Sequence, residues 1–227
     1  MKDIVLVVAV HPDDETLGCG GTLLRHKAEG AELHWLIATE LRPSGGEDSA
    51  PVREREEEIA RVAEFYGMSS VRRLGYATTR LDQAPRAELV QAFGRAIEAL
   101  EPSVLYLPFC GDAHGDHRVA FEAAYSCTKS FRHPSLRRVL MMETLSETEF
   151  APPLVHRQFM PNVFVDVTDY LEGKLRAMRI YASELGQPPF PRSEENIRAL
   201  ATLRGGVAGC RAAEAFMLLR EIRHADR

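Results

Sequence analysis

The chain has 227 residues, 45% of them hydrophobic and 27% charged, with a formal net charge of −5 at pH 7. This composition is ordinary for a globular protein, and we expect the whole chain, residues 1–227, to fold as one domain. The acidic balance argues against nucleic acid as the main partner, and no apolar run approaches the roughly 18 residues that a membrane span needs.

The first predicted element is a strand over residues 4–10, where seven apolar residues follow one another. A continuous run rich in β-branched side chains is typical of a strand buried on both faces of a parallel sheet. The elements predicted next are a helix over 16–29, a strand over 32–39, a loop over 40–51 that we expect to border a site, and an amphipathic helix over 52–66.

Strands and helices continue to alternate along the chain. The remaining predictions are strands over 71–74, 103–107, 138–143 and 163–167, and helices over 85–100, 117–130, from a cap at Thr168 to 184, and from Ser193 onward. Residues 212–222 are compatible with either a helix or a strand. The alternation predicts an α/β fold with three layers and a mostly parallel central sheet.

The chain has four cysteines without a CxxC pair, at Cys19, Cys110, Cys127 and Cys210. This pattern is typical of reduced thiols in a cytoplasmic protein, and small buried apolar side chains are the simplest role for them. The first apolar run is short and leads straight into charged residues, so we expect no signal peptide. Both features favour a cytoplasmic location.

The motif His11-Pro12-Asp13-Asp14-Glu15 directly follows the first predicted strand. In open α/β sheets, ligands bind at the carboxyl ends of the strands. Like charges clustered there are costly unless something compensates them, and a divalent metal would do so. A simple turn with an aspartate helix cap is the structural alternative for this motif alone, and a charge in the first helical turn is the simplest account of Glu15.

A second polar cluster, Asp112 with His114, Asp116 and His117, follows the predicted strand over 103–107. Loops at the same edge of a parallel sheet can converge, so the two clusters can form one site. Imidazole and carboxylate ligands without thiolates suit zinc, and less strongly manganese or iron. Three protein ligands plus a water molecule form the usual catalytic arrangement.

Spacing limits which side chains can share one ion. A turn at the strand end can aim both His11 and Asp14 at a metal, whereas Asp13 points elsewhere and can reach a metal-bound water. His114 and His117 lie on one side of a first helical turn, so one could bind the metal while the other faces the substrate.

Other catalytic motifs do not fit the chain. Glycines at positions 18, 20 and 21 follow the first strand, but Leu23 occupies the third glycine position of G-x-G-x-x-G. These glycines more simply permit close packing of the first helix on the sheet. Neither a P-loop nor a G-x-S-x-G elbow is present, which disfavours nucleotide-phosphate binding and serine hydrolysis.

Together the two clusters resemble the motifs of the LmbE/PIG-L family of zinc-dependent N-deacetylases, which act mainly on N-acetylated amino sugars and glycoconjugates. The resemblance spans most of the chain and implies a Rossmann-like fold. Weaker matches are Arg55-x-x-Glu58, Asp82 and the segment 213–216. One departure is His114-Gly115, where the family frequently has His-Pro, a change that loosens the loop without removing a functional group.

The resemblance implies that His11, Asp14 and His117 hold one zinc ion per chain. It implies that Asp13 is the general base for the zinc-activated water and that His114 is a second catalytic group near the substrate carbonyl.

By the same resemblance, Arg55 and Asp82 are candidates for substrate binding, although a helix surface charge and a turn aspartate explain them almost as well. Asp112 and Asp116 are placed behind the ligands, where carboxylates commonly orient imidazoles. Arginines in the expected rim loops, Arg42, Arg80 and Arg157, could meet an anionic group, but solvated surface arginines are more common.

The implied activity is hydrolysis of an N-acyl amide, with an N-acetylated sugar or glycoconjugate as the partner. Two alternatives stay open at this point: a metal-dependent hydrolase of another bond, such as a phosphoester, and a non-catalytic metal- or sugar-binding module. Two-metal phosphatases usually need more ligands than the two clusters supply. The sequence does not define which sugar is used, and it leaves a homo-oligomer open.

Overall fold

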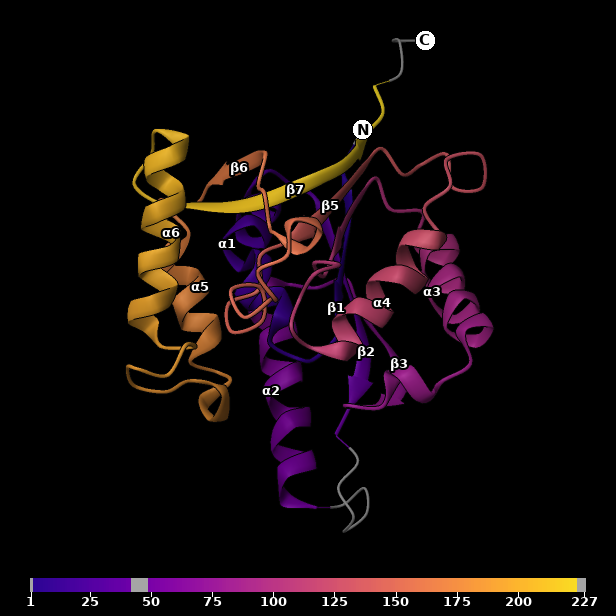
Figure 1. The fold of residues 1–227 in the computed structure, drawn as a ribbon, viewed down its shortest axis with the longest axis horizontal. Coiled ribbons are helices and arrows are strands. Elements are labelled where there is room, and N and C mark those ends of the chain that lie inside the picture. Colours follow the sequence, from indigo (N-terminus) through magenta and orange to yellow (C-terminus); the bar gives the residue numbers. More distant parts are fainter. Residues whose placement is uncertain (1, 42–48, 224–227) are drawn as a thin grey trace.

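The computed structural model describes residues 2–41 and 49–223, and a seven-stranded sheet forms its centre (Figure 1). The strands are β1 (Ile4–Ala9), β2 (Glu32–Glu40), β3 (Ser70–Ala77), β4 (Val104–Leu107), β5 (Arg138–Met142), β6 (Val163–Asp166) and β7 (Ala213–Glu221). Their order is β3-β2-β1-β4-β5-β7-β6. The first five strands in this order are parallel, whereas β7 is antiparallel to both β5 and β6. The predicted α/β class with a mostly parallel sheet is confirmed.

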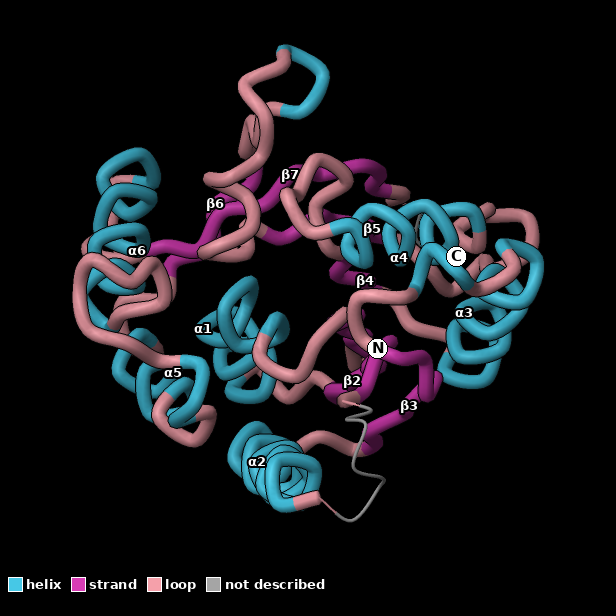
Figure 2. The backbone as a smooth tube through the Cα atoms, turned by 60° about the horizontal axis from the view of Figure 1, so that its bottom comes forward, coloured by secondary structure: helices cyan, strands magenta, loops and turns pink. Residues whose placement is uncertain are grey.

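Helices cover both faces of the sheet. They are α1 (Asp14–Ala28), α2 (Ala50–Tyr66), α3 (Arg86–Leu100), α4 (Gly115–Ser126), α5 (Leu171–Met178) and α6 (Glu194–Ala208). In Figure 2, α3 and α4 lie together on one side of the strands, and α1, α2, α5 and α6 lie on the other. This arrangement gives the three layers that the alternation of strands and helices predicted.

The central strand β1 explains why its sequence is apolar throughout. Successive side chains of a strand point to opposite faces. Val5 and Val7 pack into the core that includes α1, α2, α5 and α6, whereas Leu6 and Val8 pack into the core beneath α3 and α4. All four are fully buried, so both faces of this strand are shielded from water.

The order of the strands creates a crevice beside β1. The chain passes from β1 to β2 on one side and later returns to place β4 on the other side. The boundary between β1 and β4 is therefore a topological switch point, where ligands bind at the carboxyl ends of the strands. The motif at 11–15 follows β1 and the cluster at 112–117 follows β4, so both open into this crevice.

Several element boundaries differ from the predictions. Helix α4 begins before His117 because the ring Nδ1 of His114 accepts the backbone N–H of Asp116 at 3.1 Å, and it ends at Ser126 rather than at residue 130. The helix predicted from Thr168 to residue 184 is interrupted: α5 begins at Leu171 and ends at Met178, and Tyr181 then leaves the helical path. Residues 212–222 mostly form β7.

The glycines after the first strand allow close packing, as expected. A Cβ atom on Gly18 would lie only 2.9 Å from Cβ of Met142 in β5, and one on Gly21 would lie 2.9 Å from Cβ of Val167. Helix α1 can therefore approach the sheet more closely than larger residues would permit.

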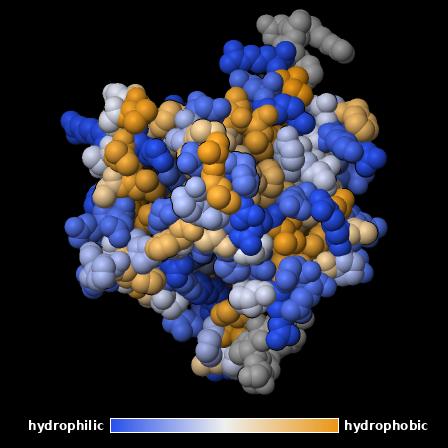
Figure 3. All heavy atoms as spheres, viewed as in Figure 1, coloured by the Kyte–Doolittle hydropathy of each residue, from blue (hydrophilic) through white to orange (hydrophobic). Residues whose placement is uncertain are grey.

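Among the helices that the structure describes, none is long and apolar enough to cross a bilayer. All four cysteines carry free thiols, and Cys19 and Cys127 are buried. On the face shown in Figure 3, hydrophilic residues are interspersed with smaller apolar areas.

Candidate metal centre and catalytic residues

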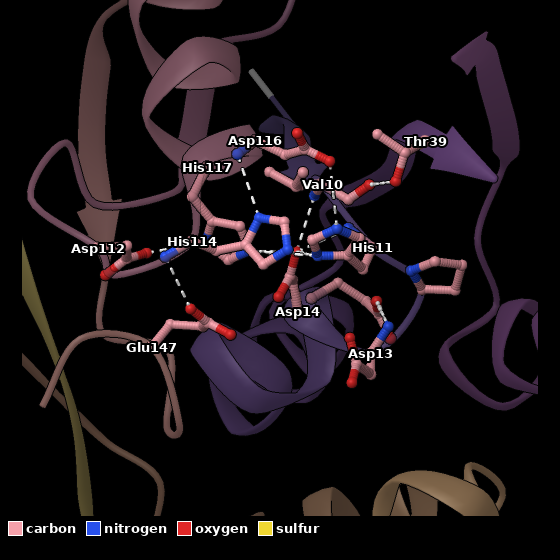
Figure 4. A network of polar contacts seen from close by, with 12 residues as sticks. Val10, His11, Asp13, Asp14, Thr39, Asp112, His114, Asp116, His117 and Glu147 are labelled. Atoms are coloured by element: carbon pink, nitrogen blue, oxygen red, sulfur yellow. Dashed lines mark hydrogen bonds and ion pairs between the residues drawn. The ribbon is translucent and has the colours of Figure 1, made fainter. Parts of the chain in front are cut away.

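Three polar side chains converge at the switch point (Figure 4). His11 follows β1, Asp14 opens α1, and His117 lies in the first turn of α4. His117 Nε2 is 3.3 Å from His11 Nδ1 and 3.3 Å from Asp14 Oδ2, and His11 Nδ1 is 3.8 Å from Asp14 Oδ2. Asp14 and His117 are buried, whereas His11 is half-buried at the floor of a cleft.

These separations fit a metal ion. Ligand atoms bound at ~2.0–2.1 Å to a tetrahedral ion lie ~3.3 Å from one another, close to the values found among these three atoms. Two imidazole nitrogens and one carboxylate oxygen form a donor set that catalytic zinc sites use, and a fourth position stays open for water or substrate. The three residues implied by the family resemblance are thus brought together.

Asp14 is held as an oriented carboxylate. Burial alone would raise the pKa of Asp14, but the neighbouring His117 and His11 lower it below its ordinary value. Its Oδ2 also accepts the backbone N–H groups of Val10 at 2.9 Å and of His11 at 2.8 Å. Asp14 is therefore ionised near neutral pH and has a fixed position beside His11 and His117.

Asp112 orients His117 from behind. Its Oδ2 lies 2.8 Å from Nδ1 of His117, and its Oδ1 accepts the hydroxyl of Thr148 at 2.7 Å. A proton on Nδ1 that is shared with Asp112 leaves the lone pair of Nε2 free for a metal. The orienting role expected of Asp112 therefore has a clear geometry.

Replacement of Asp112 by alanine is expected to lower metal affinity by ~10–100-fold, because carboxylates behind a ligand imidazole typically contribute that much. The matched control is Thr148→Val, which removes only the hydroxyl that Asp112 accepts. Its effect on metal affinity should be smaller, as measured by competition with a chromogenic chelator. Equal losses in the two variants would contradict the orienting role.

Asp116 has a different principal role. Its Oδ2 accepts the backbone N–H of Thr79 at 2.7 Å and its Oδ1 that of Leu81 at 3.1 Å, so it anchors the segment after β3. It lies 3.7 Å from Nε2 of His11, which allows it to orient that ring as well. His11, His114 and Asp116 form a second set of potential ligands, but the oxygens of Asp116 already accept backbone N–H groups.

Asp13 lines the same cleft as His11 and Asp14. Its side chain is buried, and burial raises its pKa well above the ordinary value, helped by the negative charges of Asp14 and Glu184. A carboxylate with a raised pKa accepts a proton more readily near neutral pH, which suits a general base.

His114 presents one ring nitrogen as a donor. Because its Nδ1 accepts the N–H of Asp116, the neutral ring carries its proton on Nε2. Burial lowers the pKa of His114, and the nearby His11 and His117 lower it further, which favours this neutral form. Its backbone N–H donates to Glu147 Oε2 at 3.0 Å, and its ring lines the cleft.

The two candidate substrate-binding residues are placed differently. Arg55 lines the cleft, but its guanidinium donates to the carbonyl of Pro12 at 3.0 Å and pairs with Glu184 and Glu58. It therefore supports the loop that carries Asp13. Asp82 is exposed in a short 3₁₀ turn over Leu81–Gln83 and does not line the cleft.

Three arginines were expected at the rim of the cleft, and the structure describes two of them. Arg80 is exposed and Arg157 is half-buried, and neither lines the cleft. Arg42 lies outside the described residues.

The cleft also contains residues that the sequence did not point to. Loops after β5 and after α5 contribute Thr144, Ser146, Glu147, Glu184 and Arg192. Arg192 donates to Glu184 Oε2 at 2.9 Å and to Ser146 Oγ at 3.2 Å, which ties these two loops together. No motif spacing marks these residues, because loops distant in sequence supply them.

The chain is similar to several known proteins. Residues 6–128, which contain both motifs, match the PIG-L family profile, described as GlcNAc-PI de-N-acetylase. Diacetylchitobiose deacetylase of Thermococcus kodakarensis is 28% identical over 219 residues, which cover 92% of this chain and 80% of that protein. A probable N-acetyl-alpha-D-glucosaminyl L-malate deacetylase 2 of Bacillus anthracis is 28% identical over 191 residues, covering 79% and 80%. Among solved structures, the conserved protein TT1542 from Thermus thermophilus superposes with a TM-score of 0.76 at 28% identity, over 99% of this chain and 98% of that one.

Proposed function

The chain belongs to the PIG-L family, and from that premise we propose that it is a zinc-dependent N-deacetylase of an N-acetylated amino sugar or glycoconjugate. One observation carries the proposal: three candidate ligand atoms stand at the spacing of a tetrahedral ion, and two of their residues, His11 and Asp14, line the same cleft as the buried carboxylate Asp13. His11, Asp14 and His117 would hold the ion.

A zinc ion at these ligands would polarise the acetyl carbonyl and lower the pKa of a water molecule toward ~7. Asp13 takes a proton from water as the water oxygen attacks the carbonyl carbon. The Nε2–H group of His114 donates to the carbonyl oxygen as negative charge develops there. The proton held by Asp13 then passes to the leaving nitrogen as the C–N bond breaks, which leaves acetate and a free amine.

The cleft suits one acylated sugar ring. Its volume of about 220 Å³ lies below the ~300–1,000 Å³ of pockets that enclose a whole drug-sized ligand, so the rest of a larger substrate would extend outside. Hydroxyls of Thr78 and Ser146 in the lining can form hydrogen bonds with sugar hydroxyls, whereas the hydroxyl of Thr39 already donates to the carbonyl of Val10. The two curated relatives are named for substrates that both contain an N-acetylated sugar.

Purified protein loaded with zinc is expected to release acetate and a free amine in equal amounts from at least one member of a panel. The panel comprises N-acetylglucosamine, diacetylchitobiose and N-acetylglucosaminyl L-malate. Dipicolinate should abolish turnover by removing the metal, and one equivalent of added zinc should restore it. Amine release by a fluorogenic assay and acetate release by a coupled assay provide the two measurements.

Two other outcomes would overturn this proposal. Phosphate release from phosphoesters without amine release would indicate a phosphoesterase. Tight zinc binding without turnover of any amide in the panel would indicate a binding module.

A further inference from the structure

Glu15 is a buried carboxylate that the proposed reaction does not use. Glu15 lies in the first turn of α1, as expected, but its side chain has no exposed surface. Burial raises the pKa of Glu15 to about 7 despite the hydrogen bonds that it accepts. A buried carboxylate is costly, so its contacts indicate what it contributes.

One contact of Glu15 is with the backbone of Asp13. The N–H of Asp13 donates to Glu15 Oε2 at 3.1 Å. Asp13 adopts a φ of 144°, a left-handed conformation that is strained for a residue with a side chain. Strain of this kind persists only where the surroundings hold the backbone in place.

Glu15 is itself fixed by two hydroxyls. Its Oε1 accepts the hydroxyl of Thr16 at 2.6 Å and that of Tyr181 at 3.0 Å. Tyr66 of α2 donates in turn to Thr16 Oγ1 at 3.1 Å. Helices α1 and α2 and the segment after α5 thus converge on this carboxylate.

We propose that Glu15 is a positioning residue that holds the strained backbone of Asp13 and thereby directs the Asp13 carboxylate into the cleft. The inference rests on the proposed function for the role of Asp13. Glu15 itself does not line the cleft, so its effect on the reaction passes through Asp13.

The test compares Glu15→Gln with Glu15→Met. Glutamine keeps an oxygen that can accept the N–H of Asp13, whereas methionine fills a similar volume without that acceptor. The methionine variant should lose ~10–100-fold in kcat, because a small misplacement of a catalytic group costs up to ~10²-fold. Its KM and zinc content should be unchanged, and the glutamine variant should retain most of the wild-type kcat.

A double-variant comparison separates positioning from general destabilisation. If Glu15 acts through Asp13, adding Glu15→Met to Asp13→Asn should cause no further loss of kcat. Glu214→Gln is the matched control, because Glu214 is another buried carboxylate that accepts backbone N–H groups of α1, from Gly21 at 2.9 Å and Thr22 at 2.7 Å. It should lower Tm while leaving kcat unchanged.

A crystal structure of Glu15→Met supplies a readout that does not depend on turnover. Asp13 should relax from its positive φ or move its carboxylate. An unchanged Asp13, or a full additional loss of kcat in the Asp13→Asn background, would overturn the positioning role. Full activity of Asp13→Asn alone would instead overturn the catalytic role of Asp13, and the Glu15→Met structure would still show whether Glu15 holds that backbone.

Discussion

Replacement of Asp13 by asparagine is expected to leave the zinc content unchanged and to lower kcat by ~10²–10⁴-fold, the usual contribution of a positioned general base. Asparagine has the shape of aspartate but cannot accept the proton from water. Because burial and the neighbouring Asp14 disfavour the charged form of Asp13, the neutral variant should unfold at an equal or higher Tm. The measurements are kcat with the best substrate of the panel, metal content by mass spectrometry, and Tm by calorimetry.

Asp169→Asn is the matched control for this variant. Asp169 is exposed and does not line the cleft, so its replacement should change neither rate nor metal content. If Asp13→Asn instead loses zinc but turns over at the wild-type rate per bound metal, Asp13 is a ligand and not the base.

Replacement of His117 by alanine should have the largest effect on the metal. Nε2 of His117 lies 3.3 Å from both other ligand atoms, so its removal opens the site on one side. Substitution of a residue behind a metal ligand typically lowers metal affinity by up to ~100-fold. Loss of the ligand itself should lower metal affinity by more than this, and activity should fall with it. The variant also leaves buried Asp112 without its histidine partner, which should cost about 1–3 kcal/mol of stability.

His156→Ala is the control for the loss of an imidazole, because His156 is exposed and does not line the cleft. It should bind zinc and turn over substrate as the wild type does. The metal content after dialysis shows whether the ligand has been lost. Circular dichroism shows whether the protein is still folded. A His117→Ala protein that retains one tightly bound zinc would refute the ligand assignment.

Much of the architecture could be predicted from the sequence, because local patterns reported it directly. The apolar run at 4–10 indicated a strand covered on both faces, and β1 is indeed buried on both sides. The two polar clusters could be assigned to one site because each follows a parallel strand at the same edge of the sheet. Spacing within His11-Pro12-Asp13-Asp14 also predicted that His11 and Asp14 would face each other, and His11 Nδ1 lies 3.8 Å from Asp14 Oδ2.

Other features depended on distant contacts that spacing does not encode. Glu15 has the ordinary sequence position of a helix-end charge, yet it is buried and accepts the hydroxyl of Tyr181, 166 residues later. Arg55 matched a pattern of substrate binding, yet Glu184 from the segment after α5 engages its guanidinium. The helix expected to run to residue 184 ends at Met178, and tertiary context in general can override local helix propensity.

The position of the proposed metal ligands on both sides of the switch point also bears on how the chain would resist unfolding. His11 and His117 are 106 residues apart, and the strands β2, β3 and β4 lie between them in the sequence. A metal bound by both would act as a reversible cross-link around a long loop, and it would restrict the unfolded chain in the way that a disulfide does. Metal release and global unfolding would then be linked equilibria, so that metal concentration would tune the lifetime of the folded protein as well as its activity.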